Sequence, residues 1–197
     1  MKRASLVAGL VLLPAGWLAA AQAGMVGHMA GHMIAVAIAA PLLALGLRDT
    51  RFDPACRWPR TVTPLAMSLV ELATVWGWHL PALRMLADSH GWAMIVEQAM
   101  FLAAGWLLWA AVLGTGPDRR AAGVGALLLT SMHMTLLGAL IGLAPRPLYP
   151  AMAHGMHDPL ADQQLGGVVM LMVGAASYFL GGLALLATIL RQPEPTP

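Results

Sequence analysis

Nine residues near the start of the chain combine side chains that bind soft metal ions. Residues 25–33 read Met-Val-Gly-His-Met-Ala-Gly-His-Met. At about 100° per residue in a helix, the methionines and histidines fall on one stripe: Met25, His28, Met29, His32 and Met33. Thioether and imidazole together favour a low-valent ion, with Cu(I) as the first candidate. The alternative is that the methionines only pack and that His28 sits in headgroup water.

Two turns of one helix cannot fill a coordination sphere, so we expect further ligands elsewhere in the chain. His79 follows two tryptophans and by itself is typical of a membrane interface. His90, Met94 and Glu97 share one helix face by their spacing, and Glu97 would either bind the ion or orient an imidazole. A loop that repeats the same chemistry would capture the ion, unless it is an ordinary polar connection; its candidate ligands are Met152, His154, Met156 and His157.

Composition indicates an integral membrane protein. Of its 197 residues, 59% are hydrophobic and only 10% are charged, and the mean hydropathy is +0.72; soluble domains are about a quarter charged. The net charge of +2 and the confinement of arginines to short loops argue against a nucleic-acid surface. The single cysteine, Cys56, excludes a disulfide framework and a CxxC site. Any metal site must therefore use histidine, methionine and carboxylate.

Six apolar runs are long enough to cross a bilayer, which predicts an all-α bundle of six transmembrane helices. They lie at residues 4–23, 25–47, 62–83, 91–113, 121–144 and 164–190. We expect the segment 1–23 to be retained as the first helix, although its basic start and Ala21-Gln22-Ala23 also resemble a cleavable signal peptide, whose removal would leave five helices. Residues 24–190 form one helical membrane domain, and residues 191–197 form a short proline-rich tail.

Basic residues predict the orientation. Those at positions 2–3, 48–60, 119–120 and 191 fall on one side of the membrane, whereas only Arg84 and Arg146 fall on the other. By the positive-inside rule, both termini are cytoplasmic if the first helix is retained. Except for the mid-span His133, the histidines then converge on the outer face. We expect a multi-pass protein of the bacterial inner membrane that works on the periplasmic side.

Polar residues inside or beside the spans have structural interpretations. Glu71 has no evident partner in the sequence and is interpreted as structural or proton-linked. His133 lies one turn after Thr130, its expected local partner. Asp162 fits the N-cap of the last span, and the following glycines at 166–167 would permit close helix packing.

Several segments, in order along the chain, carry a family resemblance. They are His28-Met29-Ala-Gly-His32-Met33 with Ala40-Pro41-Leu42-Leu43, Trp78-His79-Leu80-Pro81, Val96-Glu97 with Phe101, Gly105 with Trp109, residues 138–145, Pro147-Leu148-Tyr149-Pro150 and residues 162–167. Together they resemble the CtaG-like multi-span family of cytochrome c oxidase assembly factors, over about residues 25–185. The family usually has a histidine after the matched glutamate, where this chain has Gln98, and the loop 152–157 is not part of its pattern.

The resemblance implies a role in building a copper-containing oxidase, by supplying or protecting copper, with His28, His32, His79 and Glu97 matching the family pattern. We therefore predict a copper-handling assembly factor, not an enzyme, whose partners are the lipid bilayer, oxidase subunits and periplasmic copper chaperones. No Ser/His/Asp arrangement or glycine-rich phosphate loop appears in the sequence.

Two alternatives stay open. A haem b-binding anchor or electron carrier needs two facing histidines. A copper transporter needs ligands across the whole bilayer, and Met67 is the main candidate in the inner half.

Overall fold

The described part of the chain contains helices and the loops that join them, and no strands. The computed structural model describes all residues except 1, 23, 115, 117–118, 150–157 and 192–197. In chain order the elements are α1 (Lys2–Gln22), α2 (Gly24–Met33), the π-helical η1 (Ile34–Ala39), α3 (Ala40–Leu47), α4 (Pro54–Arg57), α5 (Pro64–Trp78), α6 (Pro81–Ser89), α7 (Gly91–Leu113), α8 (Arg120–Gly142), α9 (Pro159–Val169), the π-helical η4 (Met170–Gly174) and α10 (Ala175–Leu190).

This architecture confirms the predicted all-α membrane bundle. Among the described residues, five helical rods are long and apolar enough to cross a membrane: Lys2–Ala21, Gly24–Leu47, Gly91–Leu113, Arg120–Gly142 and Pro159–Leu190. The second rod joins α2, η1 and α3 end to end, and the last joins α9, η4 and α10. The chain is a multi-pass membrane protein.

The remaining predicted run, residues 62–83, differs from the expectation. Its helix α5 has 15 residues, which at 1.5 Å per residue is about 22 Å long, shorter than the hydrocarbon core of about 30 Å. The end of the run belongs to a second, nine-residue helix, α6, which begins at Pro81 because proline suits the first turn of a helix. The break places His79 at the junction of two helices instead of on the side of one.

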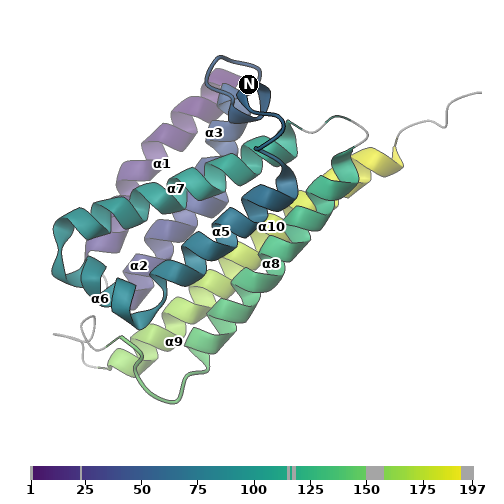
Figure 1. Ribbon diagram of the computed structural model, residues 1–197. Helices are drawn as coiled ribbons and strands as arrows, with labels where there is room; N and C mark the ends of the chain where they lie inside the picture. Colours follow the sequence, from purple (N-terminus) through teal and green to yellow (C-terminus); the bar gives the residue numbers. More distant parts are fainter. Residues whose placement is uncertain (1, 23, 115, 117–118, 150–157, 192–197) are drawn as a thin grey trace, which may run out of the picture.

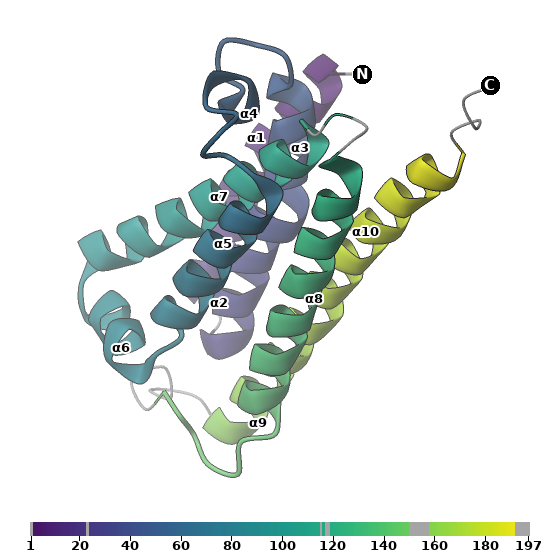
Figure 2. The same ribbon diagram turned by 45° about the vertical axis from the view of Figure 1, so that its right-hand side comes forward.

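Helix α2 is the centre of the bundle. Seven of its ten residues are buried. It packs against α1 and α9, while its continuation through η1 and α3 packs against α7, which in turn contacts α5 (Figure 1). The Lys2 end of α1 and the Leu190 end of α10 lie at one end of the bundle, and α6 and the start of α9 lie at the other (Figure 2).

Glycines bring neighbouring helices into backbone contact, and one of them, Gly167, lies where the sequence predicted close packing. A Cβ atom at Gly31 of α2 would lie 2.6 Å from the carbonyl oxygen of Gly16 on α1. A Cβ atom at Gly167 of α9 would lie 2.5 Å from the backbone nitrogen of Gly142 and 2.6 Å from the carbonyl oxygen of Gly138, both on α8. A side chain would clash at either contact, so the small residues allow the close approach that holds membrane helices together.

A proline inside the second rod is accommodated by the π-helical turn and by a neighbouring hydroxyl. Pro41 has no N–H to offer the carbonyl of Ala37, four residues earlier. The Ser177 hydroxyl of α10 donates to that carbonyl at 2.7 Å. Inside a bilayer such backbone groups must be satisfied by the protein itself. The contact therefore ties α10 to the rod that carries His28 and His32.

Asp162 caps a different helix from the one predicted. The N-cap of α9 is Asp158, whose side chain accepts a hydrogen bond from the Ala161 N–H at 3.0 Å. The Asp162 carboxylate accepts from the backbone N–H of Met25 at 2.6 Å and so caps the first turn of α2. The prediction that it caps its own helix was wrong, because spacing along the chain does not reveal which helix N-terminus lies nearby in space.

We predict that Gly167→Ala destabilises the protein by about 1–3 kcal/mol, the usual cost of overpacking, because its Cβ would meet the backbone of α8. The lowered midpoint of thermal unfolding in detergent would measure this effect. Gly125→Ala is the matched control, since a Cβ at Gly125 meets nothing within 4 Å. Equal midpoints for the two variants would contradict the proposed backbone contact.

Candidate metal centre

Two of the predicted ligands lie one turn apart in the buried core of α2. His28 and His32 are 2% and 0% exposed, and their ring centroids are 5.2 Å apart. Their spacing of four residues puts both rings on the same side of the helix. The close packing of α2 against its neighbours buries them in the protein.

A third histidine reaches the same place from the end of α5. His79 follows the last residue of α5 and is 4% exposed. Its Nδ1 donates to the carbonyl of Val75 at 2.6 Å, which fixes the tautomer and leaves Nε2 with a free lone pair. The Tyr149 hydroxyl donates to the backbone carbonyl of His79 at 2.8 Å. Both bonds hold the ring in one orientation.

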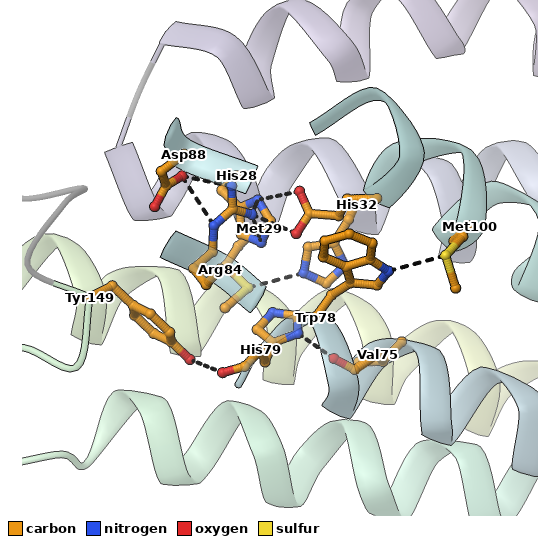
Figure 3. A network of polar contacts seen from close by, with 11 residues as sticks. His28, Met29, His32, Val75, Trp78, His79, Arg84, Asp88, Met100 and Tyr149 are labelled. Carbon is orange, nitrogen blue, oxygen red and sulfur yellow. Dashed lines mark hydrogen bonds and ion pairs between the residues drawn. The ribbon is translucent and has the colours of Figure 1, made fainter. Parts of the chain in front are cut away.

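The three imidazoles converge on one point. His28, His32 and His79 each offer one ring nitrogen, and these three atoms lie within 4.8 Å of one another (Figure 3). The ring of His79 lies 5.1 Å from that of His32 and 5.6 Å from that of His28, centroid to centroid. Phe101 of α7 stacks on His32 at 4.8 Å. Because an ion with ligand bonds of about 2.0–2.1 Å holds its nitrogens roughly 3.5 Å apart, small ring movements would close the site.

The donor atoms around this triad fit a metal ion. His32 Nδ1 and His79 Nε2 are buried and have no hydrogen-bond partner among the described residues, a state that usually costs free energy in a protein interior. The sulfur of Met29 lies 3.1 Å from Nε2 of His32. Three imidazoles and a thioether are thus available in one desolvated place, and these are ligands that copper ions accept.

Glu97 lies beside the triad and binds an arginine, Arg84, that sequence spacing did not mark as a site residue. Glu97 is fully buried, with Oε2 4.0 Å from Nδ1 of His28. Its Oε1 accepts from Nη1 of Arg84 at 2.6 Å. Arg84 lies on α6, and its Nη2 donates to Asp88 at 2.6 Å (Figure 3). The spacing of Arg84 and Asp88, four residues apart on a short helix, was the signal available in the sequence.

The other predicted ligands are distributed differently. Met25 is buried at the start of α2, where its side chain and backbone lie against Gly166 of α9. His90 is exposed at the N-terminus of α7, with its ring 6.1 Å from that of Trp92, and it does not join the triad. The loop candidates lie outside the described residues: Met152, His154, Met156 and His157.

Gln98 lines a cavity of about 260 Å³ beside the triad, together with His28, Arg84, Asp88 and Met94. The Gln98 amide is buried and has no hydrogen-bond partner among the described residues. Gln98 therefore faces the cavity that His28 of the triad also lines. A ligand or water could reach the triad from this cavity.

Two further buried polar residues lie apart from the triad. Glu71, for which the sequence offered no partner, accepts a hydrogen bond from the Tyr178 hydroxyl of α10. His133 has no partner among the described residues. Its expected partner Thr130 pairs instead with the Ser68 hydroxyl at 2.9 Å. These contacts give Glu71 and Thr130 roles in helix packing.

A second group of potential ligands is explained by local structure. One atom each from Asp49, Asp53 and Cys56 lies within 4.8 Å of the other two. Asp53 accepts from the backbone N–H groups of Asp49 and Ala55, both at 2.9 Å, and so caps α4. Its hydrogen bond to the Cys56 thiol raises the pKa of that thiol. We assign this group to the stability of the loop.

Comparison with known proteins gives an independent finding. The model of the family described as cytochrome c oxidase caa3 assembly factor matches residues 4–192, which is nearly the whole chain and includes every segment on which the resemblance rests. A search of the curated proteins and a search of the solved structures each found no match.

We predict that Tyr149→Phe lowers the free energy of unfolding at pH 8 by about 1 kcal/mol, the usual value of one hydrogen bond. Burial raises the pKa of Tyr149 to about 12, above about 10 in an unfolded chain. The phenol therefore stabilises the folded state fully below about pH 10, and this contribution disappears as the pH rises through 12. Thermal unfolding in detergent should separate the two proteins at pH 8 and bring them together towards pH 12. Equal midpoints at pH 8 would contradict this role.

Proposed function

The chain belongs to the family of cytochrome c oxidase caa3 assembly factors, and from this premise we propose that it binds one Cu(I) ion through His28, His32 and His79 and supplies it to the oxidase. The observation that carries this proposal is the convergence of the three buried ring nitrogens within 4.8 Å. Assembly factors act on a client protein, which agrees with a binding role and no reaction of its own.

The chemistry of the ligands favours Cu(I). The imidazoles are neutral when they ligate, and Met29 adds a thioether next to His32. Neutral soft ligands in a water-poor place suit a soft monovalent ion. Binding also relieves the buried nitrogens of His32 and His79 that have no partner in the described chain. Cu(I) would be the cargo that the protein delivers, and it would take part in no reaction at this site.

The same geometry argues against the haem alternative. A haem held between two histidines needs room for its macrocycle on all sides of the iron. Here the three rings lie 5.1–5.6 Å apart, and Phe101 stacks directly on His32. The third histidine and the phenylalanine would clash with a macrocycle placed between any two rings. A compact ion is the better fit.

We place the protein in the bacterial inner membrane, with the triad towards the periplasm and, with the first helix retained, both termini in the cytoplasm. Arg84 and Arg146 were the two basic residues that opposed this orientation. Arg84 is buried in ion pairs with Asp88 and Glu97, so it contributes little to the charge of the loop that the positive-inside rule counts. With the triad facing the periplasm, soluble copper chaperones would be able to load the site, and oxidase subunits would be able to receive the ion.

We predict that the detergent-purified protein binds one Cu(I) per chain, measured by competition with bicinchoninate. His32→Ala and His79→Ala should each weaken binding by more than the 10–100-fold that loss of an outer partner of a ligand typically costs. His90→Ala is the matched control, because His90 is exposed and lies outside the triad. Unchanged copper stoichiometry and affinity in the two triad variants would refute the site.

In cells that lack the endogenous protein, we predict that the wild-type chain and His90→Ala restore cytochrome c oxidase activity, whereas His32→Ala does not. Added copper should partly rescue the His32→Ala strain if delivery is the missing step. Immunoblotting of the membrane fraction controls for protein level. Restoration of full activity by His32→Ala without added copper would show that assembly does not need the triad.

A further inference from the structure

Arg84 has an environment unlike that of any other basic residue in the described chain. It is the only arginine or lysine with a buried side chain there, at 3% exposed. Its Nη1 donates to Glu97 at 2.6 Å and to Nδ1 of His28 at 2.9 Å. A permanent positive charge is therefore held in direct contact with one of the proposed copper ligands (Figure 3).

The ligand atoms alone do not decide which ion binds. Three imidazoles with a nearby carboxylate also form a typical zinc site. Glu97 Oε2 lies 4.0 Å from the ring of His28 and has no hydrogen-bond partner among the described residues. A divalent ion would find here much the same donors as a monovalent one. The preference for a monovalent or a divalent ion must therefore depend on another feature of the site.

The formal charges around the triad supply that feature. The arginine contributes +1, and its two carboxylate partners, Asp88 and Glu97, contribute −1 each. The histidines are neutral, since each needs its one ring lone pair for an ion; the lone pair of His28 accepts from the guanidinium in this structure and would have to leave it to bind the ion. The group therefore carries a net charge of −1. A monovalent ion makes the group neutral, whereas a divalent ion leaves an uncompensated positive charge next to the buried Arg84, which is costly inside a protein.

We propose that Arg84 is the residue that makes this site selective for a monovalent ion. Its fixed positive charge already offsets one of the two carboxylates, so one further positive charge makes the group neutral. The second charge of a zinc or Cu(II) ion would be in excess. This inference rests on the proposed function, because it assumes that an ion binds at the triad. Arg84 acts through charge and contributes no ligand.

Arg84 also lies next to the cavity from which an ion can approach His28. The cavity of about 260 Å³ beside the triad is lined by Arg84, Asp88 and His28. An ion that reaches His28 from this cavity passes the guanidinium at close range. For a separation of roughly 6 Å and an effective dielectric constant of about 20, each unit of charge on the ion changes affinity about a hundred-fold. The ratio of the affinities for a divalent and a monovalent ion then changes by about the same factor.

The test compares Cu(I) and Zn²⁺ affinities of the full-length protein in detergent, with bicinchoninate and 4-(2-pyridylazo)resorcinol as the competing chelators. Arg84→Gln should raise the preference for Zn²⁺ over Cu(I) by about a hundred-fold relative to the wild type. Arg84→Lys keeps the charge and should keep the wild-type preference. An unchanged ratio of affinities in Arg84→Gln would overturn the proposal.

A doubly substituted protein separates charge from hydrogen bonding and from folding. Arg84→Gln alone leaves the buried carboxylate of Glu97 and the partly exposed carboxylate of Asp88 without their cation. Arg84→Gln with Asp88→Asn returns the net charge to −1 and should return the preference to Cu(I). A double variant that still prefers Zn²⁺ would show that charge is not the cause. If the wild type binds neither ion, the proposed function itself fails; if it binds both but Arg84→Gln leaves their ratio unchanged, only the role of Arg84 fails.

Discussion

The ion pair between Arg84 and Glu97 is the interaction on which the candidate metal centre depends. It joins α6 to α7 at 2.6 Å, and the same guanidinium contacts His28 of α2 at 2.9 Å. Removing one partner of such a buried pair leaves an unpaired charge and typically costs about 3–5 kcal/mol. Because α6 begins just after His79, this pair also holds the junction that aims the third imidazole at the other two.

The second constraint is the central position of α2. Close contacts of Gly31 with α1, and of α9 with the first turn of α2, leave that helix with almost no exposed side chain. Histidines in such a place have little access to water, so each is stabilised by a protein partner or a ligand. His28 finds Arg84, while one nitrogen of His32 and one of His79 find no partner in the described chain. The packing that builds the bundle is thus also what makes these nitrogens available to an ion.

Sequence reasoning succeeded where a signal lies within one segment and failed where two segments meet. The spacing of His28 and His32 predicted one face of one helix, and that face is observed. Asp162 was assigned to its own helix but caps α2. His90 lies near Glu97 in the sequence, yet it is exposed and does not join the triad. Arg84 was counted only as a topological charge, because its partners Glu97 and His28 are 13 and 56 residues away along the chain.

The membrane class, the helical fold, the family resemblance and the methionine and histidine stripe follow from the sequence alone, because hydropathy and helical periodicity are local properties of the chain. The three-dimensional packing was needed to learn that His79 completes the triad, that His90 does not, and that a buried arginine contributes to the charge of the candidate site. These depend on distances between helices that are far apart in sequence. Such distances are set by backbone contacts and caps like those at Gly167 and Asp162, which no single segment specifies.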